Sequence, residues 1–278
     1  LGQLTDTPND SEAISVNGSP ATGTIVNDET TMLTISGVSQ SEGTGGATTS
    51  FTFDVTWSNP VQGGLTIAYT TDNGTATVAD GDYVDNDDAL TFAGTADETQ
   101  TITVAVNQDS KVERDETFSV SLGTLSQLLD SAMVDDIDVT GSPASGTIEN
   151  DDTATIAFAE DTSLVLEDAE SHSVVVQLVV SGDGTIGEAV SVDVSVLASS
   201  TAQTPDDFTL VTTSVTFQAG SGDGATQIIN LDIAADTVSE SEDETIDLQL
   251  SLDGDGIDGN VTLGVIDENT VAMQGDPE

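Results

Sequence analysis

The chain has 278 residues, of which 51 are Asp or Glu and only 2 are Lys or Arg, so its formal net charge at pH 7 is −49. Nucleic acid backbones and anionic lipids would repel such a polyanion, which excludes both as partners and leaves cations as its natural ligands. The absence of cysteine excludes disulfide frameworks and thiol chemistry but not an extracellular location. No stretch is long and apolar enough for membrane insertion, and the length suits about two domains.

A phrase near the start of the chain, at 18–29, recurs later in the sequence. Gly-Ser-Pro-Ala-Thr-Gly-Thr-Ile-Val-Asn-Asp-Glu begins at Gly18, and Gly-Ser-Pro-Ala-Ser-Gly-Thr-Ile-Glu-Asn-Asp-Asp begins at Gly141. An acidic run that returns at domain-sized spacing indicates the junction between two modules. We therefore expect residues 1–28 to be the C-terminal strand portion of a preceding repeat. One sandwich should then span 29–150, and a second 151–278 with a short C-terminal tail from residue 271.

Residues 29–150 carry the strand pattern most clearly at Phe51, Phe53, Val55 and Trp57, which alternate with polar residues. A period of two places the apolar residues on one sheet face and the polar residues in water. Similar stretches predict strands at 32–35, 65–71, 89–92, 102–106, 118–122 and 144–148.

Residues 151–278 repeat this organisation, with strands expected at 174–180, 190–196, 215–217, 229–233, 246–250 and 261–266. No window shows a sustained helical period. About seven short strands in roughly 120 residues indicate two sheets packed face to face. The predicted fold is therefore all-β, as tandem seven-stranded antiparallel immunoglobulin-like β-sandwiches.

Acidic residues of the repeat at 29–150 gather in four places outside the strands. These are Glu42, the Gly81-Asp82-Tyr83 phrase, residues 109–116, and Asn150-Asp151-Asp152. Loops of one polarity leave a sandwich at the same end, so the four places can converge on one spot. Carboxylates packed together repel one another, and a hard cation such as Ca²⁺, which takes six to eight oxygen ligands, removes that cost. The alternative is that these are solvated acids in an acid-rich protein.

Several phrases of the chain resemble the Calx-beta repeat, a module of sodium/calcium exchangers, integrin beta-4 and many large bacterial surface proteins. They are Gly74-Thr-Ala-Thr-Val-Ala-Asp-Gly-Asp-Tyr83, Leu90-Thr-Phe92, Thr101-Ile-Thr-Val104, Val112-Glu-Arg-Asp-Glu-Thr-Phe118 and Gly146-Thr-Ile-Glu-Asn-Asp-Asp152. Both complete repeats are covered, and residues 1–28 fit the final strand of the module.

The resemblance implies calcium ligands at one tip of each sandwich. In the repeat at 29–150 these are Glu42, Asp82, Asp109, Glu113, Glu116, Asp151 and Asp152. In the last repeat they are Glu167, Asp207, Asp236, Glu240, Glu244, Asp267 and Glu268. The truncated first repeat retains Asp28 and Glu29, and its site would need a donor from outside this segment. Gln108 stands at a position that is often acidic, which implies fewer ions in the middle repeat.

The two basic residues, Lys111 and Arg114, both fall inside the acidic loop. They could clamp it by ion pairs, although an exposed pair stabilises by at most about 1 kcal/mol and a solvated role is favoured. No nucleophile, phosphate-loop or dinucleotide motif is present, so the sequence does not predict an enzyme.

Two functions remain open on the sequence. The first is a non-catalytic, calcium-stiffened stalk or fibre of an extracellular cell-surface protein, adhesin or filament. The second is a calcium-sensing or receptor-binding module whose shape depends on ion occupancy.

The partners expected besides calcium ions are neighbouring repeats or identical subunits. If Leu1 is a mature N-terminus, residues 1–28 could complete the sandwich of a neighbouring subunit by strand exchange. The alternative is that the segment belongs to a longer array of repeats.

Overall fold

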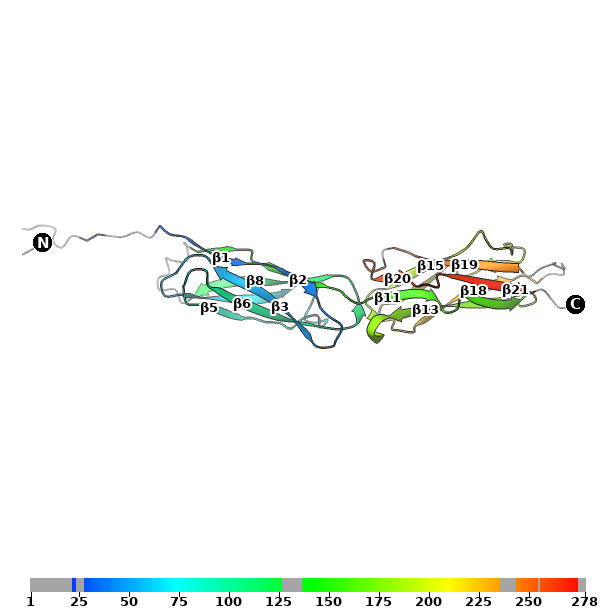
Figure 1. Ribbon diagram of the computed structural model, residues 1–278, viewed down its shortest axis with the longest axis horizontal. Coiled ribbons are helices and arrows are strands. Elements are labelled where there is room, and N and C mark those ends of the chain that lie inside the picture. The colour runs from blue at the N-terminus through cyan, green and yellow to red at the C-terminus, as the bar shows by residue number, and fades with distance from the viewer. Residues whose placement is uncertain (1–21, 24–27, 127–136, 236–243, 255, 275–278) are drawn as a thin grey trace, which may run out of the picture.

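The computed structural model describes residues 22–23, 28–126, 137–235, 244–254 and 256–274, which form two β-sandwiches joined end to end (Figure 1). Each sandwich has its own hydrophobic core, one running from Leu33 to Ile148 and the other centred on residues from Ala154 to Met273. The prediction of an all-β chain with tandem sandwiches is confirmed. Most of the segment 1–28, together with Asp236 and Glu240, lies outside the described residues. None of the described residues belongs to a helix long and apolar enough to cross a membrane.

The first sandwich packs a four-stranded sheet against a five-stranded sheet. In spatial order the smaller sheet contains β6 (Thr99–Asn107), β3 (Thr48–Trp57), β1 (Thr31–Ile35) and β9 (Ile137–Thr140). The larger sheet contains β2 (Val38–Ser41), β10 (Ala144–Glu149), β8 (Glu116–Ser126), β4 (Leu65–Asn73) and β5 (Asp88–Phe92).

The core of this sandwich follows the alternation read from the sequence. Phe51, Phe53, Val55 and Trp57 of β3 are each 0% exposed. The ring of Phe118, from the opposite sheet, lies 5.9 Å from the rings of both Phe51 and Phe53, centroid to centroid. This aromatic contact between sheets fixes the position of β8, whose first residues belong to the acidic end of the sandwich.

The second sandwich packs two five-stranded sheets. One contains β16 (Phe208–Leu210), β18 (Thr226–Ile233), β13 (Ser171–Val180), β11 (Ala154–Phe158) and β20 (Val261–Leu263). The other contains β12 (Thr162–Leu166), β21 (Glu268–Gln274), β19 (Glu244–Leu252), β15 (Val190–Val196) and β17 (Ser214–Phe217).

Strand number and direction differ from the prediction. The sheets of the described residues hold nine strands in the first sandwich and ten in the second, and each sandwich includes parallel pairs. One cause, which accounts for the parallel pairs β2–β10 and β12–β21, is a change of sheet near the start of each repeat. The chain leaves β1, turns at Gly37 and enters β2 in the opposite sheet, where it runs parallel to β10. A Cβ on Gly37 would lie 2.7 Å from the carbonyl oxygen of Ser145, so the crossing needs glycine.

The final strand, β21, was not predicted. Residues from 271 onward were expected to be a tail, but Val271 and Met273 are 0% and 4% exposed in the second core. β21 pairs in parallel with β12 and antiparallel with β19, as β10 pairs with β2 and β8 in the first sandwich. β21 is therefore the counterpart of β10.

The two sandwiches are joined by more than the linker between β10 and β11. The loop after β6 forms a short strand, β7 (Lys111–Val112), which pairs in parallel with β14 (Thr185–Ile186) of the second sandwich. The backbone N–H of Gly187 donates to the carbonyl of Val112 at 2.8 Å. The side chain of Val112 is 0% exposed and belongs to the core of the second sandwich. One acidic loop of the first sandwich is thus inserted into its neighbour.

Candidate metal centre

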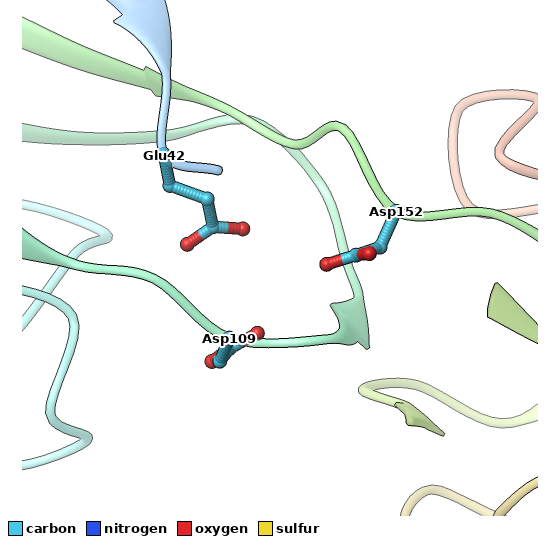
Figure 2. Close-up of side chains that lie close together, drawn as sticks. All are labelled: Glu42, Asp109 and Asp152. Atoms are coloured by element: carbon cyan, nitrogen blue, oxygen red, sulfur yellow. The ribbon is translucent and has the colours of Figure 1, made fainter. Parts of the chain in front are cut away.

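Six carboxylates of the first sandwich gather in two groups at the end that faces the second sandwich. In one group, carboxylate oxygens of Glu42, Asp109 and Asp152 lie within 4.8 Å of one another. In the other, oxygens of Asp82, Glu113 and Glu116 meet the same limit. Figure 2 shows the first three side chains arranged around a common space, each carried by a different loop.

Glu42 is positioned by the end of β2. Its backbone N–H donates to the carbonyl of Glu149 at 3.3 Å, which extends the pairing of β2 with β10 by one residue. The hydroxyl of Thr49 donates to the carbonyl of Glu42. The residue is only 5% exposed, so its carboxylate stands among the other ligand-bearing loops and not in open water.

Asp152 lies on the linker between β10 and β11 and is 0% exposed. The Asn150 amide donates to its carbonyl at 2.8 Å, and the Ser181 hydroxyl of the second sandwich donates to its Oδ1 at 3.3 Å. Its other carboxylate oxygen, Oδ2, is buried without a hydrogen-bond partner among the described residues. A buried carboxylate oxygen left without a donor is costly, and a cation in the common space would satisfy it.

The second group is positioned from the core. Tyr83 stacks on Phe118 with ring centroids 4.7 Å apart, which places the preceding Asp82 at the rim. The backbone N–H of Thr77 donates to Asp82 Oδ2 at 2.6 Å. Glu116 opens β8, and Glu113 follows β7 and pairs with Lys111. Lys111 therefore supplies this group with one positive charge.

Burial and crowding raise the pKa of several of these carboxyl groups. Burial, followed by the charges of Asp109, Glu113 and Asp152, raises the pKa of Glu42 to about 8. Burial and the neighbouring Asp82 raise the pKa of Glu116 to about 8. The pKa of Asp152 is also raised, by burial first and then by Asp151 and Asp109. The two groups thus hold negative charge at a cost that a hard cation would remove.

This arrangement predicts a pH dependence of the cation-free protein. A carboxyl group whose pKa is raised on folding contributes most stability below its unfolded value, near 4.5 for Glu42, and loses that contribution as pH rises through about 8. We expect the melting temperature of the cation-free chain to fall by at least about 5 °C between pH 5 and pH 8. Thermal unfolding at several pH values measures this.

The matched variant is Glu42→Gln, which removes one of the two strongly shifted groups but keeps the shape of the side chain. Its melting temperature should fall less steeply than that of the wild type over the same range. Equal slopes would mean that Glu42 does not titrate in this window and that general charge repulsion accounts for the dependence.

Arg114 has a different role from the loop clamp considered above. Its guanidinium pairs with two acids of the second sandwich, with Glu188 at 3.1 Å from Nε to Oε1, and with Asp258. The three side chains are about 40–50% exposed, so each pair contributes at most about 1 kcal/mol. The nearby Asn260 amide also reaches across the junction and donates to the carbonyl of Glu113 at 3.1 Å.

The remaining residues expected at this tip are placed as follows. Asp151 is exposed beside Asp152 and does not join either group of three, although its charge acts on both Glu42 and Asp152. Asp28 and Glu29 are exposed before β1, at the end of the first sandwich away from the junction.

In the second sandwich the structure places some predicted residues in matching positions. Glu167 follows β12, and its N–H donates to the carbonyl of Gln274, as Glu42 does to Glu149. Asp207 Oδ2 accepts from the N–H of Gln203 at 2.5 Å, as Asp82 does from Thr77, and Glu244 opens β19. Among the described residues, however, no three carboxylates of this sandwich approach as closely as those of the first.

Asp267 and Glu268 do not lie at this tip. Glu268 opens β21 and pairs with Gln249, whereas Glu244 pairs with Met273, near the other end of the strand. The acidic phrase there was read as the junction run, but it lies at the start of the last strand and not after its end. The counterpart of Asn150-Asp151-Asp152 comes after Gln274, outside the described residues.

Comparison with protein-family models shows to which family the chain belongs. The Calx-beta domain model matches residues 30–146 and again 149–274. The chain belongs to the Calx-beta family. The resemblance stated from the sequence phrases is thereby confirmed, and the two Calx-beta matches coincide with the two sandwiches. Comparison with curated protein sequences gives no match.

The solved structures similar to this Calx-beta chain cover either most of it or a little under half of it. The CBD12 structure from CALX1.2 is 17% identical to this chain. The match spans 87% of this chain and 100% of the CBD12 chain, with a TM-score of 0.37. The calcium binding domain CBD12 of CALX1.1 is 18% identical. The match spans 87% of this chain and 98% of that domain, with a TM-score of 0.34. The apo-form Calx CBD1 domain is 22% identical. The match spans 44% of this chain and 99% of that domain, with a TM-score of 0.36.

Two residues of the site were missed by the sequence reading. Ser181, which donates to Asp152, comes from the second sandwich, and only the docking of the two modules brings it there. Val112 lies between charged residues in an acidic loop, so the sequence pattern did not indicate that its side chain is buried in the neighbouring core.

Proposed function

We propose that the first Calx-beta module binds calcium at Glu42, Asp109 and Asp152, and that this binding fixes its orientation to the second module. The observation that carries the proposal is the buried Oδ2 of Asp152, which has no hydrogen-bond partner among the described residues and lies beside the carboxylates of Glu42 and Asp109. The other oxygen of the same carboxylate, Oδ1, accepts from Ser181 of the next module. Ca²⁺ prefers such carboxylate and carbonyl oxygens and tolerates irregular geometry. The second group, Asp82, Glu113 and Glu116, is a further candidate site, partly neutralised by Lys111.

The link to the junction comes from shared residues. The loop that carries Asp109 and Glu113 also carries Val112, which is buried in the second core. The linker that carries Asp152 is hydrogen bonded to the second module through Ser181. Bound calcium would hold this loop and this linker together, so it would oppose bending between the modules. By linkage, a rigid junction would also favour calcium binding.

On this basis the chain is proposed to be a non-catalytic, calcium-stiffened segment of a stalk or fibre outside the cell, in an adhesin or filament. The end-to-end order of the modules and the strong acidity of the chain support an elongated element in calcium-rich fluid (Figure 1). The proposed partners of this element are neighbouring repeats or identical subunits, the latter joined through strand exchange by residues 1–28.

Calorimetric titration of the chain with calcium tests the proposal and separates it from the sensor alternative. A stiffener of extracellular fluid is expected to bind calcium with a dissociation constant of roughly 10⁻⁴–10⁻³ M, whereas a sensor binds in the range of about 10⁻⁷–10⁻⁵ M. Magnesium, which demands a tighter octahedral shell, should bind more weakly. Absence of calcium binding up to 10⁻² M would overturn the proposed function.

A further inference from the structure

Gln108 is a neutral side chain between two acidic loops of the metal centre. It directly precedes Asp109, and its amide reaches the loop that follows Glu42. Its Oε1 accepts from the backbone N–H of Gly45 at 3.2 Å, and its Nε2 donates to the hydroxyl of Thr49 at 2.8 Å. The Thr49 hydroxyl in turn donates to the carbonyl of Glu42. One amide therefore connects the loop of Asp109 to the backbone of Glu42.

The loop after Glu42 is shaped around this amide. A Cβ on Gly43 would lie 2.9 Å from Gln108 Nε2, and a Cβ on Gly45 would lie 2.8 Å from Gln108 Oε1. Gly43 also has a φ of +91°, which L side chains rarely adopt. The backbone N–H of Gln108 donates to the carbonyl of Ala47 at 3.0 Å. The two glycines leave the space in which the Gln108 side chain lies.

The chemistry of the contact requires an amide. A threonine hydroxyl has one proton, and in Thr49 that proton is given to the carbonyl of Glu42. The remaining lone pairs of the hydroxyl can only accept, so its second partner must be a donor, as the Gln108 NH₂ group is. A carboxylate at position 108 would face those lone pairs and would add negative charge beside Glu42.

We propose that Gln108 is a positioning residue of the calcium site, which aligns Glu42 with Asp109 through the hydroxyl of Thr49. The proposal rests on the proposed function, because it assigns a role within the same site. It replaces the interpretation of Gln108 as a ligand position at which an acid has been lost. Position 108 needs a neutral amide because its two hydrogen bonds require an acceptor for the Gly45 N–H and a donor to the Thr49 hydroxyl.

The two interpretations predict opposite results for Gln108→Glu in the full chain. If position 108 is a lost ligand position, the added carboxylate should tighten calcium binding or add an ion. If Gln108 is a positioning residue, Gln108→Glu and Gln108→Ala should both weaken calcium binding by about 10-fold, as loss of a group that orients a ligand does. The control is Gln40→Ala, which removes an amide on β2 that donates to the carbonyl of Ser50 and should leave the affinity unchanged.

A measurement without calcium tests the same contact independently. Hydrogen exchange at the Gly45 amide in the calcium-free protein should accelerate about 10-fold in Gln108→Ala and stay at the wild-type rate in Gln40→Ala. Tighter calcium binding by Gln108→Glu, or unchanged Gly45 exchange in Gln108→Ala, would overturn the proposal. If the wild type bound no calcium, the proposed function would fail, and Gly45 exchange would still decide whether Gln108 orders the loop.

Discussion

Asp152→Asn is expected to weaken calcium binding by about 100-fold, or about 2.7 kcal/mol, and at the same time to stabilise the calcium-free chain. The affinity falls because the charged carboxylate of Asp152, whose buried Oδ2 has no hydrogen-bond partner among the described residues, is replaced by a neutral amide. The calcium-free protein gains stability because a fully buried charge beside Glu42 and Asp109 is removed. Calorimetry and thermal unfolding with and without calcium measure the two effects.

The opposite signs make this prediction specific. A substitution that merely damaged the fold would lower both the affinity and the calcium-free melting temperature. Asp151→Asn removes a charge from the exposed neighbour and should reduce the affinity by less than about 3-fold, and the remote, exposed Asp138→Asn should not change it. A calcium affinity within 3-fold of the wild type in Asp152→Asn would show that Asp152 does not bind the ion.

Val112→Asp is expected to release the inserted loop from the second module and to loosen the junction. Burying a valine side chain stabilises by about 2 kcal/mol, more than each exposed ion pair of Arg114. An aspartate at this position would also carry a charge into the hydrophobic core of the second sandwich. We expect a wider distribution of distances between the modules even with calcium present, and a calcium affinity at least about 5-fold weaker, through linkage.

Val104→Ala is the matched control for this variant. Val104 is also 0% exposed, but its side chain belongs to the core of the first module. It should lower the melting temperature of that module without widening the distance distribution. If Val112→Asp kept the wild-type distribution, the inserted loop would not be what holds the junction.

Much of the fold could be predicted from local patterns. The alternation of Phe51, Phe53, Val55 and Trp57 identifies a strand and its buried face, because a sheet has a period of two residues. The reading of β21 failed for an equally local reason. An acidic phrase at 267–269 resembles the junction phrase at 150–152, and resemblance of a few residues does not show on which side of a strand they lie. The parallel pairs were missed because they join segments far apart in the chain.

The convergence of acidic loops was predictable from sandwich topology, which places loops of one polarity at one end. The structure brings six of the predicted residues into two groups there. What the sequence could not show is how the groups are held. The contacts of Ser181 with Asp152, of Asn260 with Glu113 and of Val112 with the second core all depend on how one module docks on the next. Gln108 was read by its charge alone, whereas its role depends on the proton of Thr49.

The account claims that calcium fixes the angle between the two modules, and a distance distribution between them tests this most directly. The chain has no cysteine, so spin labels can be attached uniquely at Thr52→Cys and Ser251→Cys, exposed positions on β3 and β19. With calcium the distribution should be a single narrow peak, and after chelation it should broaden at least about twofold. Equal widths in the two conditions, in a protein shown by calorimetry to bind calcium, would contradict the account.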